Sequence, residues 1–294
     1  MTIARILAPA KLNLGLEILG KRADGYHEIR TVMQAISLCD TLSAVPAGNV
    51  SLIVDRDELD YDDNLVCKAV RAWSQAAGMP RAQLAVSLAK RIPTSSGLGG
   101  ASSDAAAALR LANALYLDRI PEPELQRVAA TIGSDVPFFL GDPTAFVAGR
   151  GEIIEPLPPI QARWFVLVTP DVAINRKTAT MYANLTQADF SDGSAIEENV
   201  RQAKRGHLAE IELLTNAFEM VLLRMMPELR RIPDALRTLG ANRVSLTGAG
   251  PTWFAMVDGQ SDAETLAHEM RDRFPLSSIN VASTLDTFPA VELI

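Results

Sequence analysis

One short segment concentrates the residues that could bind a phosphate group. Gly-Leu-Gly-Gly at 97–100 is followed by Ala-Ser-Ser at 101–103, and an alanine-rich, helix-forming run starts at Ala105. Glycines leave backbone N–H groups free of Cβ obstruction, and the first turn of a helix adds unpaired N–H groups and the positive end of its dipole. The segment therefore predicts an anion site, best suited to a phosphate chain. Ser102 and Ser103 add hydroxyls that could contact a phosphate oxygen or a bound Mg²⁺.

Two other phosphate-binding loops do not fit this segment. A Walker A loop needs Gly-Lys-Ser or Gly-Lys-Thr after its glycines, and no lysine follows Gly100 here. The dinucleotide fingerprint needs a third glycine where this chain has Ser102. A plain glycine-rich turn with Ser102 as helix N-cap would give the same string of residues, so the motif alone leaves both interpretations open.

The elements before this segment are predicted to be mainly strands. Leu12, Leu14, Leu16 and Ile18 alternate with other residues at a period near two, which favours a half-buried strand. One helix is predicted at 64–77, because Gly78-Met-Pro80 is a typical helix stop. The order of strands, helix and strand favours an α+β fold. Further strands are predicted at 31–44, 50–54 and 82–92.

The elements after the segment alternate between helix and sheet. The helix at 122–132 has proline and acidic residues in its first turn and a glycine after its last. Pro156-Leu-Pro-Pro159 is the best linker candidate. A strand, a glycine turn and a strand are predicted for 244–257. Other helices are predicted from 105 and at 176–184, 195–203 and 261–273, and the region 211–239 is predicted to be mostly helical with breaks at Pro227 and Pro233. Other strands are predicted at 144–147, 152–157, 164–168 and from 279.

Composition excludes several classes of protein. Of 294 residues, 48% are hydrophobic and 21% charged, as in ordinary globular proteins, and the net charge is −7. That sign argues against a nucleic-acid binder or a polybasic membrane-surface protein, although backbone amides can still bind a small anion. Cys39 and Cys67 lack partners for a disulfide framework or zinc site and are expected to be buried. No apolar run is long enough to span a bilayer, so a cytoplasmic protein is expected. His207 and His268 are expected at the surface.

Four blocks in a fixed order resemble the motifs of the GHMP kinase superfamily, which includes galactokinase, homoserine kinase and mevalonate kinase. They are Pro-Ala-Lys-Leu-Asn-Leu-Gly-Leu at 9–16, the glycine segment at 97–103, Gly-Ser-Asp-Val-Pro at 133–137, and Leu-Thr-Gly-Ala-Gly-Pro at 246–251. The segment 20–28, Gly-Lys-Arg-Ala-Asp-Gly-Tyr-His-Glu, is similar to the signature of members whose substrate is a methylerythritol joined to cytidine diphosphate. The resemblance covers essentially the whole chain.

The resemblance implies a two-domain α+β fold with the active site in the cleft between the domains. The N-terminal ATP-binding domain, 1–157, would have a mixed sheet with a left-handed β-α-β crossover. The C-terminal domain, 158–294, would be a ferredoxin-like sandwich. The implied activity is transfer of the γ-phosphoryl group of ATP, with Mg²⁺, to the C2 hydroxyl of the cytidine-diphosphate substrate, in the non-mevalonate isoprenoid pathway. No nucleic-acid or membrane partner is implied, and the oligomeric state stays open.

The resemblance also implies a catalytic pair, Lys11 and Asp135. An aspartate near the attacking hydroxyl can orient it or accept its proton, and a nearby ammonium keeps that aspartate ionised. A lysine inside an apolar strand must reach solvent or a counter-charge, and Asp135 is the expected partner of Lys11. Asp135 could otherwise cap a turn or helix. The implied ATP and phosphate contacts are Pro93, Thr94, Ser95, Ser96, Gly97, Leu98, Gly99, Gly100, Ala101, Ser102 and Ser103, with Ser103 a candidate contact to Mg²⁺.

Substrate contacts are implied at three further places. Tyr26 could stack on the cytosine and His27 could hydrogen-bond its edge, although such a pair is also common at a protein surface. Asn13 lies two residues beyond Lys11, on the same strand face, and could bond substrate hydroxyls or cap a turn. The glycine turn at 247–250 could approach the substrate or be a tight hairpin, and glycine suits both. The implied substrate residues are Asn13, Tyr26, His27, Thr178, Thr247, Gly248, Ala249 and Gly250.

The match with the superfamily has departures. Thr94-Ser-Ser96 precedes Gly97 and Ala101 replaces a usual glycine, so nucleotide affinity is the property these changes could alter. Arg176 and Lys177 add basic residues near the predicted substrate site, where they could contact its phosphates. Three rivals remain: a homoserine-type kinase, a phosphomevalonate-type kinase, and a ligand-binding regulator without catalysis. Tyr26 and His27 favour a substrate with a nucleobase, and Lys11 with Asp135 favours catalysis.

Overall fold

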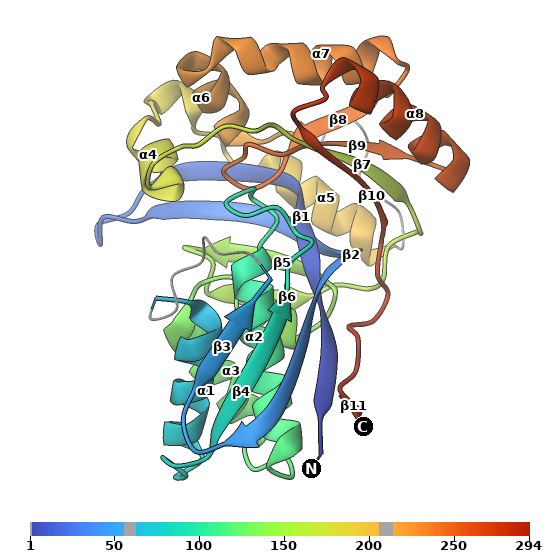
Figure 1. The fold of residues 1–294 in the computed structure, drawn as a ribbon. Coiled ribbons are helices and arrows are strands. Elements are labelled where there is room, and N and C mark those ends of the chain that lie inside the picture. The colour runs from blue at the N-terminus through green and yellow to red at the C-terminus, as the bar shows by residue number, and fades with distance from the viewer. Residues whose placement is uncertain (1, 56–62, 206–213) are drawn as a thin grey trace.

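The computed structural model describes residues 2–55, 63–205 and 214–294. Within these ranges the chain forms a seven-stranded mixed sheet and a four-stranded sheet, with helices packed against both. Figure 1 shows the first sheet in the lower half and the second in the upper half. The α+β fold class predicted from the order of the elements is confirmed.

The first sheet is built on a long antiparallel hairpin. Its order is β11-β1-β2-β4-β3. β5 pairs with residues 29–34 of β2, and β6 pairs with β5. Among the strands of the described residues, only β3 and β4 are parallel neighbours in this sheet. Helix α1 (Leu65–Ala76) lies between them in the chain, so this is the β-α-β crossover of the fold. The strands are β1 (Ala4–Lys21), β2 (His27–Ala47), β3 (Ser51–Val54), β4 (Gln83–Ala89), β5 (Thr144–Gly149), β6 (Ile153–Pro156) and β11 (Glu292–Leu293).

Three helices pack together on the first sheet, α1 (Leu65–Ala76), α2 (Gly100–Leu115) and α3 (Glu122–Ile132). α2 lies against β1 with a run of buried alanines, whose small side chains allow a close approach to the sheet. Trp73 of α1 is fully buried, and its indole N–H donates to Asn113 of α2. This core holds the N-terminal end of α2, which follows the glycine segment, in a fixed place.

The second sheet is antiparallel throughout, with the order β10-β7-β9-β8. Numbered by their order in the chain, these strands run 4-1-3-2, with helices after the first and third. This is the split β-α-β arrangement of ferredoxin-like domains. The strands are β7 (Trp164–Thr169), β8 (Arg243–Leu246), β9 (Trp253–Val257) and β10 (Ser278–Ser283). The helices are α4 (Lys177–Ala183), α5 (Ser194–Lys204), α6 (Ala217–Met225), α7 (Arg231–Thr238) and α8 (Gln260–Arg273).

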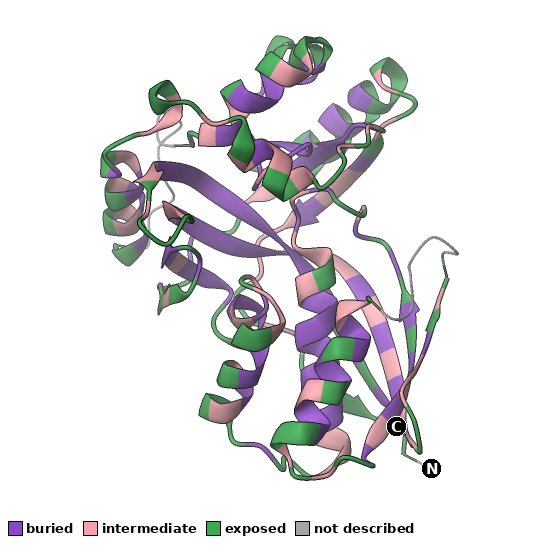
Figure 2. Cartoon of the chain, turned by 90° about the vertical axis from the view of Figure 1, so that its left-hand side faces the viewer, coloured by how far each residue is buried: buried purple, intermediate pink, exposed green. Residues whose placement is uncertain are grey.

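The hairpin of β1 and β2 runs through both halves of the molecule. β1 is buried over most of its length, and β2 is buried without interruption from 31 to 36, where the paired strands are purple in Figure 2. Leu16 and Ile18 of β1 pack into the same core as Val166 of β7. At the other end, β11 returns to pair with β1, which places the two chain ends side by side in Figure 1. The division of the chain near residue 157 stays a prediction.

Most predicted elements are present, and three differ. α2 begins at Gly100 rather than at 105, because the small residues after Gly99 already form helical hydrogen bonds, such as Ser103 N–H to the Gly99 carbonyl. In the region 211–239 the break predicted at Pro227 is present, whereas Pro233 does not interrupt a helix but lies in the first turn of α7; residues 211–213 lie outside the described ranges. β11 was not predicted.

Three smaller predictions concern cysteines, histidines and membrane spans. Cys67 is buried, whereas Cys39 is only half-buried, and both are free thiols. His268 is exposed on α8, and His207 lies outside the described ranges. None of the helices in the described parts of the chain is long and apolar enough to cross a bilayer.

Candidate active site

The glycine segment forms a loop that leads into the first turn of α2. Gly99 is the N-cap residue and adopts a left-handed conformation with φ of 73°. The Lys11 N–H donates to the Leu98 carbonyl at 2.9 Å, which ties the loop to β1. A Cβ at Gly97 would lie 2.4 Å from the Thr247 carbonyl oxygen, so only glycine allows this loop to approach the glycine turn after β8.

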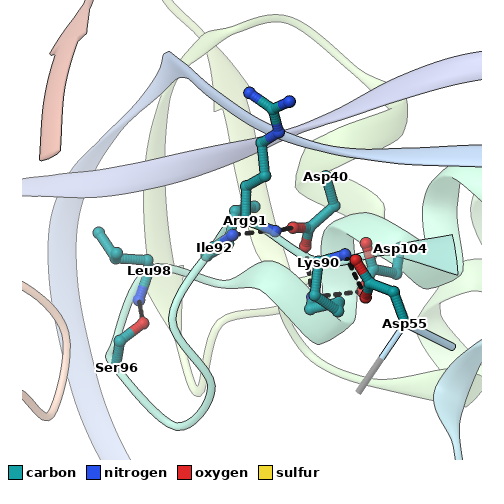
Figure 3. A network of polar contacts seen from close by, with 8 residues as sticks. All are labelled: Asp40, Asp55, Lys90, Arg91, Ile92, Ser96, Leu98 and Asp104. Atoms are coloured by element: carbon teal, nitrogen blue, oxygen red, sulfur yellow. Dashed lines mark hydrogen bonds and ion pairs between the residues drawn. The ribbon is translucent and has the colours of Figure 1, made fainter. Parts of the chain in front are cut away.

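The serines of this loop have different environments. Ser103 is only 1% exposed, and its Oγ has no hydrogen-bond partner among the described residues. A buried hydroxyl without a partner is costly, so it fits a site where a phosphate oxygen or its Mg²⁺ completes the bonding. Ser96 instead accepts a bond from the Leu98 N–H at 3.4 Å within the loop (Figure 3). The remaining predicted contacts divide into exposed Thr94, Ser95 and Ala101 and half-buried Pro93, Gly100 and Ser102.

Lys11 and Asn13 lie on one face of β1, as their spacing predicts, but the strand is buried on both faces here rather than half-buried. Lys11 Nζ donates to Asn13 Oδ1 at 2.6 Å, and the Asn13 amide donates to Thr31 Oγ1 at 2.9 Å. Burial lowers the pKa of Lys11, and the charge of Asp135 opposes that shift. The structure therefore brings Lys11 and Asp135 into electrostatic range, but among the described residues they form no direct ion pair.

Asp135 lies in a turn between α3 and the 3₁₀ helix η1 (Pro137–Leu140). The Val136 N–H donates to the Gly133 carbonyl at 3.2 Å, which closes this turn, and the Asp135 side chain is half-buried. Its charge also affects the pKa of Lys177 and of Tyr182. The charge of Asp135 thus acts on three side chains from two elements, Lys11 of β1 and Lys177 and Tyr182 of α4.

The glycine turn at 247–250 joins β8 to β9, as the hairpin interpretation predicts, and it lies against Gly97 and Asn13. Its approach to a substrate stays a prediction. The Asn13 N–H donates to Thr247 Oγ1 at 3.1 Å. A Cβ at Gly248 would lie 3.4 Å from Lys11 Nζ. Asn216, at the N-terminus of α6, donates to the carbonyls of Leu246 and Gly248 at 2.8 and 3.0 Å and so fixes the turn. This role of Asn216 was not predicted.

Lys177 of α4 contacts the glycine turn. Lys177 donates to the Gly250 carbonyl, and burial followed by the charge of Lys11 lowers the pKa of Lys177 to about 8. Thr178, a predicted substrate contact, is exposed in the first turn of α4. Ala249 is half-buried in the facing turn.

An aromatic cluster lies beside the site. His27 stacks on Tyr182, with ring centroids 5.0 Å apart and an interplanar angle of 27°, and Phe190 lies 6.1 Å from His27. Tyr26 is 55% exposed, and the Arg150 guanidinium lies over its ring at 5.0 Å. Burial lowers the pKa of His27 and raises that of Tyr182 to about 12. The sequence analysis predicts Tyr26 and His27 as substrate residues but does not include Tyr182. The pattern that could have indicated Tyr182 is an aromatic residue four positions after the predicted contact Thr178.

A buried ionic cluster lies beside the glycine segment at 97–103, and the sequence analysis did not predict it. Lys90, just after β4, donates to Asp40 of β2 and, at 2.7 Å, to Asp104 of α2 (Figure 3). Asp40 also accepts the N–H of Ile92 at 2.8 Å. Burial raises the pKa of Asp104 to about 7, against the opposing charge of Lys90. The cluster ties both ends of the loop, residues 90–92 and the first turns of α2, to β2.

Within the described ranges, no three His, Cys, Asp or Glu side chains gather as a metal site. The Ser103 hydroxyl therefore stays the predicted contact to a phosphate-bound Mg²⁺.

Family models match two parts of the chain. The model described as GHMP kinases N terminal domain matches residues 64–149, and the model described as GHMP kinases C terminal matches residues 195–276. The first match includes the phosphate loop and Asp135, and the second includes the glycine turn.

Named relatives are similar over most of the chain. The 4-diphosphocytidyl-2-C-methyl-D-erythritol kinase of Dehalococcoides mccartyi strain BAV1 is 41% identical over 266 residues, covering 90% of this chain and 93% of the relative. The enzyme of the same name from Geobacillus kaustophilus is 37% identical over 271 residues, covering 90% and 92%.

Solved structures show the same fold. A crystal structure of 4-(cytidine 5'-diphospho)-2C-methyl-D-erythritol kinase has a TM-score of 0.81 and 32% identity, covering 95% of this chain and 98% of that chain. The homoserine kinase from Cytophaga hutchinsonii has a TM-score of 0.73 with 17% identity, covering 100% and 97%, which shows the fold alone.

Proposed function

Because the chain belongs to the GHMP kinase family, we propose that it transfers the γ-phosphoryl group of ATP to the C2 hydroxyl of 4-diphosphocytidyl-2-C-methyl-D-erythritol. The observation that carries this proposal is the meeting of two glycine-rich loops at Lys11 and Asn13, with Gly97 packed against Thr247. The similarity to kinases of that name supports the acceptor. Family models within 1–157 and 158–294 support an ATP-binding N-terminal domain and a separate C-terminal domain.

The phosphate loop and the first turn of α2 would hold the ATP phosphates. The N–H groups after Gly99 point from the helix N-terminus, and the buried Ser103 hydroxyl has no protein partner among the described residues. Mg²⁺, when bound with ATP, supplies charge neutralisation on the phosphates. The chain itself orients the phosphates through this loop, which Lys90, Asp40 and Asp104 hold against β2.

Lys11 and Asp135 act on the reacting groups. Asp135 orients the acceptor hydroxyl and takes up its proton as the hydroxyl oxygen attacks. Lys11 stabilises negative charge that develops during transfer, and Asn13 holds its ammonium in place at 2.6 Å. The buried setting strengthens both effects, since water screens charges less there.

The aromatic cluster would hold the cytosine end of the acceptor. The exposed ring of Tyr26 offers a face on which a pyrimidine can stack, and His27, which itself stacks on Tyr182, offers a hydrogen-bonding edge. Lowering of the His27 pKa by burial favours its neutral form, which carries one donor and one acceptor. A nucleobase substrate suits this cluster better than a bare small alcohol.

The direct test is an acceptor panel. Purified protein is given Mg-ATP with the cytidine-diphosphate substrate, homoserine or phosphomevalonate, and ADP release is measured. We expect turnover with the first acceptor only. Turnover of homoserine or phosphomevalonate instead would overturn the specificity, and no ADP release with any acceptor would favour a regulator.

A matched pair of variants tests the role of Asp135. Asp135→Asn removes the charge in the turn before η1, and Asp142→Asn removes a charge from an exposed position seven residues later. We expect ADP release to fall below detection in the first and to stay at the wild-type rate in the second, with unchanged thermal unfolding in both. Wild-type activity in Asp135→Asn would remove Asp135 from the mechanism.

A further inference from the structure

Lys177 is a charged residue of the site, and the mechanism proposed for Lys11 and Asp135 gives it no role. It is the first residue of α4, and its ammonium donates to the Gly250 carbonyl. That same carbonyl oxygen lies 2.9 Å from the position a Cβ would take at Gly97. The ammonium of Lys177 therefore lies at the junction of the phosphate loop and the glycine turn.

The electrostatic partners of Lys177 are the two groups assigned to catalysis. Its pKa is lowered to about 8 by burial and by the charge of Lys11, and the charge of Asp135 opposes the shift. Two ammonium groups thus share one carboxylate. A half-buried excess of positive charge is unfavourable by itself and is relieved by an anion.

The hydrogen bonding of Lys177 leaves room for such an anion. An ammonium has three N–H donors, and one of them is used on Gly250 in the described part of the chain. Arg176, the neighbouring basic residue, is exposed and does not take part in this electrostatic group. Of the two basic residues that the sequence offered for phosphate binding, Lys177 is the one that faces the catalytic pair.

We propose that Lys177 is a third catalytic residue, whose ammonium hydrogen-bonds a non-bridging oxygen of the phosphoryl group during its transfer. The inference rests on the proposed kinase function. In the step, the acceptor oxygen forms a bond to the γ-phosphorus, and the bond from that phosphorus to the β,γ-bridging oxygen breaks. ADP leaves with the electron pair, the hydroxyl proton goes to Asp135, and Lys177 keeps its proton throughout.

Steady-state kinetics of two variants test this role. Lys177→Met keeps the length of the side chain without its charge, Lys177→Arg keeps the charge, and Lys204→Met on the surface of α5 is the control. We expect kcat to fall about 100-fold in Lys177→Met with KM little changed, because one donor to the transition state is lost. Lys177→Arg should recover most of that loss, and Lys204→Met should match the wild type. A raised KM with unchanged kcat, or an equal loss in both Lys177 variants together with a lower melting temperature, would overturn the proposal.

A second measurement does not depend on turnover. Competitive acetylation followed by peptide mass spectrometry gives the pKa of Lys177 in the intact protein, with and without the magnesium complex of AMP-PNP. We expect the pKa to rise with AMP-PNP and to rise less with ADP, which lacks the γ-phosphate. Equal pKa values in all three conditions would refute the contact. If no acceptor is phosphorylated but the pKa rises, the proposed acceptor is wrong and the phosphate contact stands.

Discussion

Two buried lysines, Lys90 and Lys11, lie next to the glycine segment at 97–103, and their charges have opposite kinds of surroundings. Lys90 bonds two carboxylates, those of Asp40 and Asp104, and these contacts raise its pKa against the effect of burial. Lys11 bonds a neutral amide oxygen of Asn13, and burial lowers its pKa. When all groups are ionised, the Lys90 cluster has one ammonium for two carboxylates, whereas the site around Lys11 has two ammoniums for one carboxylate.

This difference separates a structural cluster from the proposed catalytic one. In the Lys90 cluster the ammonium bonds the carboxylates of Asp40 and Asp104. These bonds, with the one from Ile92 N–H to Asp40, connect β2, residues 90–92 and α2, so the cluster fixes the backbone at both ends of the loop. The site around Lys11 and Lys177 keeps an excess of positive charge next to the glycine loops, where an anionic substrate can use it. Burial of a lysine alone does not distinguish the two; the number of carboxylates within bonding distance does.

The largest effect is expected from Lys90→Met, which leaves two buried carboxylates without a cation. Loss of one partner from a buried ionic cluster costs about 3–5 kcal/mol of folding stability. Denaturant unfolding measures this loss. Lys68→Met is the matched control, because Lys68 pairs with Asp63 at 2.8 Å on the surface and should change little. If Lys90→Met is as stable as Lys68→Met, the cluster does not hold the fold.

Lys11→Met should show the opposite pattern. We expect kcat to fall about 1,000-fold, since a group that stabilises developing charge is removed. Folding stability should not fall, because a lysine whose pKa is lowered by burial costs free energy to keep charged. ADP release and denaturant unfolding on one preparation measure both. A loss of stability like that of Lys90→Met would make Lys11 structural and remove the contrast.

Gly97→Ala tests the contact between the two loops. A Cβ there would lie 2.4 Å from the Thr247 carbonyl oxygen, in a backbone with φ of +89°. Gly240→Ala is the control, since Gly240 has φ of +94° and no heavy atom within 4 Å of an added Cβ. In both variants the left-handed backbone costs about 1–2 kcal/mol of folding stability. Only Gly97→Ala should also lower kcat, about 100-fold, because its Cβ moves the two loops apart. Equal kcat in the two variants would show that the approach of the loops is not needed.

The sequence predicts the elements that local residues determine. Pro121 and Gly133 mark both ends of α3, which spans the predicted 122–132. The glycines at 97–100 predict the loop because positive φ and close backbone approach require them. Alternating apolar residues predict β1, and the same period places Lys11 and Asn13 on one face.

The remaining features depend on contacts between distant parts of the chain. Asp40 and Lys90 are fifty positions apart, and neither has a local motif that indicates an ion pair. β11 is two residues long and forms only because β1 offers an edge. Stacking of His27 on Tyr182 likewise joins the β1–β2 hairpin to α4. Such contacts follow from the tertiary fold, which neither propensity nor periodicity determines.

The pH dependence of activity gives the smallest expected effect. Because Lys177 must keep its proton and has a pKa of about 8, kcat/KM should fall as pH rises through about 8, up to tenfold per pH unit. Lys90, whose pKa is raised, stays protonated over this range and should not contribute. Lys177→Arg keeps its charge above pH 8, so this part of the profile should move to higher pH in the variant. A pH–rate profile of the wild type and of Lys177→Arg measures the difference. If Lys177→Arg has the same profile as the wild type, the fall in kcat/KM above pH 8 comes from deprotonation of Lys11. Lys11 alone would then supply the positive charge that activity requires.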